Sequence, residues 1–123
     1  MEPTLTPKLA PYLVVNDARG LSQFLETALG GRTTYEQVAP DGRRVHVEVR
    51  VADGLVMMGD APPGHPPFPA MIHLYVEDAT KSYERALAAG ATSVRVPERS
   101  PDGLVRGGVS DRWGNQWWFS THP

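Results

Sequence analysis

The sequence predicts an α+β fold made of two tandem β-α-β-β-β modules. Three observations carry this prediction. Two segments, Ala10–Gly31 and Met71–Ala91, each begin with an apolar run typical of a strand, reach an aspartate, and continue with apolar residues at helical spacing. The two aspartates, Asp17 and Asp78, lie 61 positions apart, about half of the chain. Each segment is followed by further runs that are typical of strands.

The first predicted helix begins after Asp17, whose side chain is a preferred helix N-cap. Gly30 and Gly31 end it, because glycine readily adopts the left-handed conformation that closes many helices. The residues between them place one apolar stripe along the helix, formed by Leu21, Phe24, Leu25, Ala28 and Leu29. This stripe predicts which face of the helix packs on the sheet.

Three strands are predicted after this helix. Arg32–Val38 is the first, and Arg44–Ala52 is the clearest, since four valines alternate with polar residues. Asp53-Gly54 predicts a two-residue hairpin, with Leu55–Gly59 as the returning strand. The valine face belongs against the helix, so the polar residues of that strand face away from it.

The second half repeats this order. Its helix carries the apolar stripe Ala79, Tyr83, Ala86 and Leu87 and ends at Gly90, and its later strands are Thr92–Val96, Leu104–Ser110 and Gln116–Thr121. The predicted modules span residues 8–60 and 70–122. Residues 61–69 between them are too rich in proline for a helix or a central strand and are interpreted as a semi-rigid linker.

Composition restricts the class of protein. The 123 residues fit a single domain spanning 1–123, and a net charge of −2 supplies no basic field for nucleic acid or a membrane surface. The chain has no cysteine, so thiolate metal sites and cysteine nucleophiles are excluded. No apolar run reaches the roughly 20 residues of a membrane span, and the first residues do not resemble a signal peptide. We therefore expect a cytoplasmic protein with no nucleic-acid or membrane partner.

Four stretches resemble the vicinal oxygen chelate superfamily, which includes glyoxalase I, bleomycin-resistance proteins and extradiol dioxygenases. They are PYLVVNDA with the helix end ALGG, VHVEVRVADGLVMMGD, HLYVEDATKSYERALAAGAT, and the closing DRWGNQWWF, which has Arg112 where the family usually has proline. The resemblance implies that each module curls its sheet into a half-cup with the helix on the convex side. It also implies a homodimer, in which strands are sometimes exchanged between chains.

Metal-using members of this family carry four ligands, usually His, Gln or Glu, that point into the cup. The corresponding positions here are Ala10, Met57, Met71 and Trp118. Thioethers are soft ligands suited to copper(I), and alanine and tryptophan offer no ligand atom for a divalent ion. We therefore expect no metal and no cofactor, as in the metal-free bleomycin-resistance type that this chain resembles.

Trp118 is the most informative residue of the closing strand. Alternation puts Trp117 and Phe119 on one face, where two apolar rings suit the core, and Trp118 on the other, toward the cup. Two interpretations remain open. The indole either fills the space that a metal would occupy, or it forms a flat wall on which an aromatic ligand stacks.

Nine further residues are predicted to line the same cup. Met57 and Met71 adapt their shape to varied ligands, although ordinary packing explains either one alone. The others are Tyr12, His46, Glu48, Arg50, His73, Tyr75 and Arg106. The stripe of His46, Glu48 and Arg50 also fits a solvated face or an internal ion pair, and no residue is assigned a catalytic role.

The function predicted from these residues is metal-independent binding of a small aromatic or polycyclic molecule, in antibiotic resistance or as an accessory in biosynthesis. The alternative is a metal-dependent lyase, isomerase or dioxygenase, which requires His46, Glu48 or His73 to coordinate from positions that the family does not use. A third possibility is a diverged member whose filled cup leaves only a dimer scaffold.

Overall fold

The computed structural model describes residues 7–123 and contains the two predicted modules in the predicted order. The first module consists of β1 (Tyr12–Val15), α1 (Ala18–Leu29), β2 (Arg32–Val38), β3 (Arg44–Val51) and β4 (Gly54–Asp60). The second consists of β5 (Met71–Tyr75), α2 (Ala79–Ala88), β6 (Thr92–Arg99), β7 (Val105–Ser110) and β8 (Gln116–Thr121). The predicted α+β fold class is confirmed.

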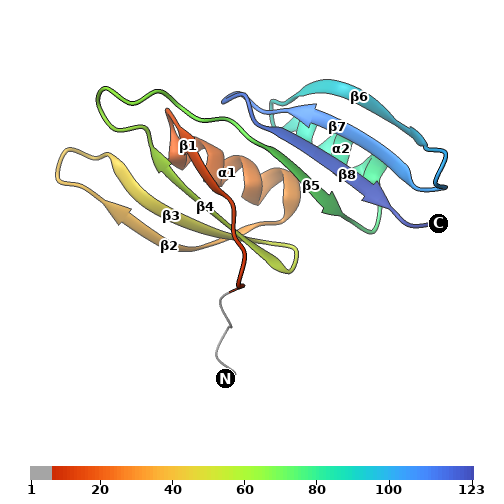
Figure 1. The fold of residues 1–123 in the computed structure, drawn as a ribbon, viewed down its shortest axis with the longest axis horizontal. Helices are drawn as coiled ribbons and strands as arrows, with labels where there is room; N and C mark the ends of the chain where they lie inside the picture. Colours follow the sequence, from red (N-terminus) through yellow and green to blue (C-terminus); the bar gives the residue numbers. More distant parts are fainter. Residues whose placement is uncertain (1–6) are drawn as a thin grey trace.

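Each module forms its own four-stranded mixed sheet. The strand orders are β1-β4-β3-β2 and β5-β8-β7-β6, with the first pair parallel and the other pairs antiparallel. Figure 1 shows the two sheets side by side, with α1 and α2 behind them in this view. Within the described part of the chain, the sheets do not join into one sheet, and neither sheet closes on itself.

One apolar core joins both modules, because α1 packs on α2 as well as on its own sheet. Three of the four alternating valines predicted to face the helix, Val47, Val49 and Val51, are buried, as are Trp117 and Phe119 of β8, both 0% exposed. Val45, near the start of β3, is partly buried. The other fully buried strand residues include Leu13, Val15 and Met58. The predicted division of β3 and β8 into a core face and an opposite face is therefore confirmed.

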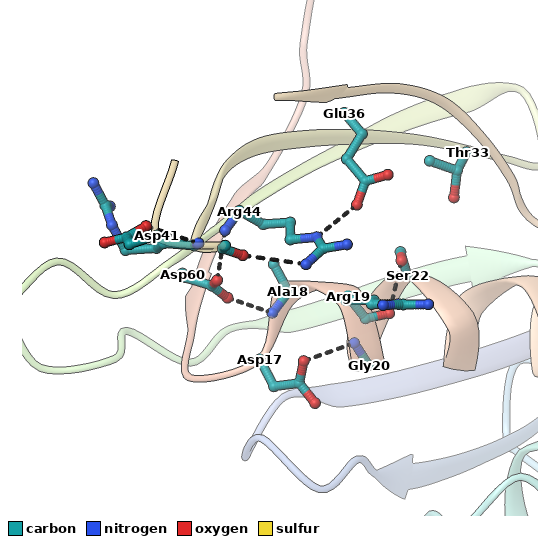
Figure 2. Close-up of polar contacts among 12 residues, drawn as sticks. Asp17, Ala18, Arg19, Gly20, Ser22, Thr33, Glu36, Asp41, Arg44 and Asp60 are labelled. Carbon is teal, nitrogen blue, oxygen red and sulfur yellow. Dashed lines mark hydrogen bonds and ion pairs between the residues drawn. The ribbon is translucent and has the colours of Figure 1, made fainter. Parts of the chain in front are cut away.

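Helix capping also follows the prediction. Asp17 accepts a hydrogen bond from the Gly20 N–H at 2.9 Å, Asp78 accepts one from Lys81, and Gly30 ends α1 in the left-handed conformation with φ 65°. A second contact holds the start of α1. Asp60 at the end of β4 accepts from the N–H groups of Ala18 and Arg44, both at 2.7 Å (Figure 2).

The predicted boundaries that differ most from the structure lie in the hairpin loop between β3 and β4 and in β6. Val51 pairs with Gly54, so the hairpin loop is Ala52-Asp53 rather than Asp53-Gly54, and Ala52 has φ 53°, which normally favours glycine. The strand predicted to end at Val96 continues to Arg99 with irregular pairing. It continues through Pro97 because β6 is an edge strand, where a missing N–H need not interrupt the ladder.

The linker is attached to the first sheet instead of running free of it. The Phe68 N–H donates to the Val14 carbonyl at 2.9 Å, which forms an isolated bridge on the outer edge of β1. The Ala70 N–H donates to the Asn115 side chain at 3.0 Å. The linker is thereby held against β1 of module one, and the residue that follows it is bound to module two.

Candidate functional site

All ten predicted site residues lie on the sheet faces that point away from the core. We call the first inner face the surface formed by Tyr12, His46, Glu48, Arg50 and Met57, and the second inner face the surface formed by Met71, His73, Tyr75, Arg106 and Trp118. The assignment follows from alternation with the buried residues and from the strand registers. Whether these residues bind a ligand stays a prediction.

The register relates the two inner faces to each other. Tyr12 pairs with Met57 across β1 and β4, and His73 pairs with Trp118 across β5 and β8. Because the two sheets have the same strand order, Met57 and Trp118 occupy equivalent positions. The methionine of one module therefore corresponds to the tryptophan of the other.

His46 is the centre of the first inner face. Its Nε2 lies 2.8 Å from Glu48 Oε2, and its ring stacks on Tyr12 with centroids 5.6 Å apart. Tyr35 of β2, which the sequence did not single out, contacts the same imidazole at 5.9 Å. Burial raises the pKa of the Tyr12 phenol, which donates to the Val45 carbonyl at 3.3 Å. This cluster is an imidazole between two phenol rings, oriented by a carboxylate.

The indole of Trp118 covers Gly108, its cross-strand neighbour on β7. A Cβ atom built on Gly108 would lie 2.6 to 2.8 Å from Cδ2, Cε2 and Cε3 of the indole. Three ring atoms at nearly equal distance mean that the face of the ring, and not its edge, lies over the glycine. The indole N–H donates to Gln116 Oε1 at 3.0 Å. The ring is thus held flat on the sheet, and the residue as a whole is partly exposed.

A chain of polar contacts lies beside this indole. Ser120, which is fully buried, accepts a hydrogen bond from Arg106 Nε at 2.9 Å, and its hydroxyl lies 2.7 Å from His73 Nε2. Burial and the nearby charge of Arg106 lower the pKa of His73, so its imidazole is neutral at neutral pH. Alternation along β8 puts Ser120 on the same face as Trp118, but its bridging role was not predicted, because a lone serine has no distinctive pattern.

The close approach of the indole to Gly108 could have been suspected from the sequence, because two adjacent glycines are unusual inside a strand. Gly107 and Gly108 lie in the interior of β7, where glycine is unfavourable unless another group approaches the backbone closely. Pro97 covers Gly107, and Trp118 covers Gly108. The double glycine therefore marks two close approaches.

The closing turn is held by one carboxylate. Asp111 accepts from the N–H groups of Trp113 and Asn115 at 2.9 Å each, from Asn115 Nδ2 at 3.0 Å and from Trp117 Nε1 at 2.8 Å. The hydrogen bonds of Asp111 thus hold the turn DRWGN and the start of β8 in one conformation. The orientation of Trp117, and by alternation that of Trp118, follows from this conformation.

The residues at the family's metal positions do not fit a metal ion. Ala10, Met57, Met71 and Trp118 offer two thioethers and no oxygen or imidazole ligand. Within residues 7–123, no three His, Asp or Glu side chains are placed to hold a metal together. His46 and Glu48 contact each other, and His73 contacts Ser120. We therefore derive no chemistry through a metal.

A cleft of about 230 Å³ opens between the two modules. It is mostly apolar, with Pro11, Leu55, Ile72 and Leu74 among its lining residues. Of the predicted site residues it includes only His73 and Tyr75. Of the inner-face residues outside the cleft, Tyr12 is 43% and Met71 67% exposed, and the others are partly buried. Among the described residues, no helix is long and apolar enough to cross a membrane.

Several known proteins are similar to this chain. An uncharacterized protein of Mycobacterium tuberculosis is 33% identical over 122 residues, which cover 90% of this chain and 72% of that protein. The crystal structure of TioX from Micromonospora sp. ML1 superposes with a TM-score of 0.80 at 25% identity, covering 95% of this chain and 99% of TioX. TnmS3, an antibiotic binding protein from Streptomyces sp. CB03234, superposes with a TM-score of 0.74 at 19% identity, covering 99% and 100%.

The family comparison agrees with the fold and covers most of the chain. Residues 8–119 match the model of one family, and both β-α-β-β-β modules fall almost entirely within this range. The chain belongs to the Glyoxalase/Bleomycin resistance protein/Dioxygenase superfamily.

Proposed function

We propose that the protein binds and sequesters a small, flat aromatic molecule without a metal ion. The observation that carries the proposal is the indole of Trp118, which is held flat over Gly108 and is partly exposed. A ring fixed in this way loses little conformational entropy when a second ring stacks on it. The likeness to an antibiotic binding protein supports the same proposal.

The expected affinity is moderate. Burial of about 300 Å² of apolar ligand surface, at roughly 25 cal/mol per Å², contributes about 7 kcal/mol before the entropy losses of binding. Micromolar binding of a polycyclic ligand follows from this magnitude. Antibiotic resistance or an accessory role in biosynthesis is the biological setting that we propose for such a protein.

We also propose that a second copy of the chain covers the inner faces. Each face carries large side chains that are exposed in one chain, Tyr12 on the first inner face and Met71 and Tyr75 on the second. A ligand stacked on Trp118 of a single chain would keep one side in water. A homodimer whose partner forms the opposite wall would enclose the ligand, and sedimentation of the purified protein at two concentrations measures its mass.

Titration of tryptophan fluorescence with polycyclic aromatic antibiotics, an anthracycline among them, tests the proposed function. We expect quenching with the wild type and at least tenfold weaker binding with Trp118→Ala. Trp113→Phe is the matched control, because Trp113 packs on Phe24 at the helix side. The proposal fails if no compound quenches the signal, or if Trp118→Ala binds as the wild type does.

Metal analysis separates binding from the enzyme alternative. Protein purified without a chelator is expected to contain far less than one equivalent of zinc, nickel, manganese or iron. A near-stoichiometric amount of any of them would replace the proposal with a metal-dependent reaction.

A further inference from the structure

The groups beside Trp118 indicate what else its ligand must carry. Arg106 lies two residues before Gly108 on β7 and on the same face, so strand geometry places it roughly 8 Å from Trp118 along the sheet. His73 is the direct cross-strand partner of Trp118 on the other side. A ligand one or two rings wide that stacks on the indole therefore reaches either side chain.

The proton positions in this network follow from Ser120. Its hydroxyl is fully buried and, among residues 7–123, has two partners, Arg106 Nε and His73 Nε2. Arginine only donates, so the serine proton must go to His73 Nε2. The proton of the neutral imidazole then resides on Nδ1. His73 consequently presents an N–H donor, and not an acceptor, to its remaining neighbours.

The carboxylates near Arg106 are already bound. Asp102 accepts from Arg106 Nη2 at 3.2 Å and from the Leu104 N–H at 3.1 Å, while Glu98 accepts from Arg95 Nε at 3.0 Å. The amide oxygen of Gln116 accepts from the Trp118 indole. The acceptors beside the indole are thus engaged within the described part of the chain.

Donors remain in excess on this surface. Arg106 is one quarter exposed, and its contacts with Ser120 and Asp102 use only Nε and one N–H of Nη2. The guanidinium has five N–H groups in a planar fork. The second inner face therefore offers N–H donors from Arg106 and His73 next to a stacking surface.

We infer that the ligand is an aromatic ring system with an oxygen acceptor attached to the ring, a carboxylate or a conjugated carbonyl, which Arg106 and His73 bind while the ring stacks on Trp118. This inference rests on the proposed function and names the chemistry of the same site. A ligand whose only polar group is a cation or a donor would leave these N–H groups unpaired against it.

Two probes of the same ring size test the inference. 2-Naphthoate carries the acceptor, and 2-naphthylmethylammonium carries a donor of opposite charge at the same position. Calorimetric titration of the wild-type protein should show naphthoate binding at least tenfold more tightly, since hydrogen bonds to charged groups are the stronger class. Arg106→Gln should remove this preference.

The matched control is Arg85→Gln, which removes the same charge from the exposed surface of α2 and should leave both affinities unchanged. Asp102→Asn should strengthen naphthoate binding, because it releases the guanidinium from a competing carboxylate. His73→Phe keeps a ring and removes the donor, so it should weaken naphthoate binding even if Arg106→Gln fails to fold, which circular dichroism reports.

The outcomes separate the two proposals. If the ammonium probe binds as tightly as naphthoate, and Trp118→Ala weakens both, the acceptor inference is overturned and stacking on Trp118 stands. If Trp118→Ala changes neither affinity, or neither probe binds, the stacking function fails and the inference fails with it.

Discussion

The two modules have the same frame but different inner faces. In both, an aspartate caps the helix, the first strand pairs in parallel with the last, and apolar residues fill the helix side. The first inner face then carries a histidine bound to a carboxylate, whereas the second carries a flat indole beside an arginine. The core face is therefore constrained by packing in both modules, while the inner face is free to differ.

The fastening of the last strand differs as well. β3 and β4 are joined by the short exposed loop Ala52-Asp53, whereas β7 and β8 are joined by a turn built around the buried Asp111. The start of the helix is held by Asp60 in one module and by the Thr121 hydroxyl in the other. The second module thus has the better-fixed closing strand, which is the strand that carries Trp118.

The largest expected effect tests this difference in the turns. Asp111→Ala should lower the free energy of unfolding by about 4 kcal/mol, because it leaves several buried N–H donors without an acceptor. Asp53→Ala, the control in the exposed loop of the first module, should change it by less than about 0.5 kcal/mol. Urea unfolding measures both values. Equal effects would contradict the conclusion that a buried carboxylate stabilises the turn of the second module and not that of the first.

The next effect concerns the glycine beneath the indole. Gly108→Ala places a Cβ atom 2.6 Å from the ring, so Trp118 must move, and we expect a loss of about 2 kcal/mol. Near-ultraviolet circular dichroism should show the changed indole environment. Gly54→Ala in the first module is the control, since its Cβ would meet only the Val51 carbonyl at an ordinary 3.5 Å. An unchanged spectrum for Gly108→Ala would mean that the indole does not lie on the strand.

A smaller pair of effects compares left-handed positions. Ala52 has φ 53° in the first module, and Gly114 has φ 89° in the turn of the second. Ala52→Gly should therefore stabilise the protein by about 1 kcal/mol, and Gly114→Ala should destabilise it by about the same amount. Thermal unfolding of the two variants measures both shifts, and shifts of the same sign would contradict the explanation.

The smallest expected effect concerns the titration of His73. The charged neighbour of His73 in the second module is Arg106, whereas the charged neighbour of His46 in the first module is Glu48. The pKa of His73 is lowered from 6.5 by burial and by the arginine, so its NMR titration midpoint should lie below 6.5 and rise in Arg106→Gln. The unfolded chain binds this proton more readily, so stability should fall as the pH drops below 6.5 toward the folded pKa. A midpoint at or above 6.5 would show that the arginine does not act on His73.

Much of the fold was predictable because it depends on short-range patterns. The caps Asp17 and Asp78, the stop at Gly30 and the valines of β3 were recognisable from chemistry within a few residues of each other. The hairpin loop was misplaced by one residue, since Asp-Gly is a common turn pair and the register that puts Gly54 opposite Val51 is set across strands. The role of Ser120 was missed because its partners lie 14 and 47 residues away.

The module order, the face on which each strand residue lies, and the unsuitability of Ala10, Met57, Met71 and Trp118 as metal ligands could all be recognised in the sequence. These follow from residue type and from periods of two and 3.6, which are local properties of the chain. The flat position of the indole on Gly108 and the link from His73 through Ser120 to Arg106 depend instead on how the strands assemble. The physical reason is that strand register brings together residues that are far apart in the sequence, and no local pattern shows which of them will meet.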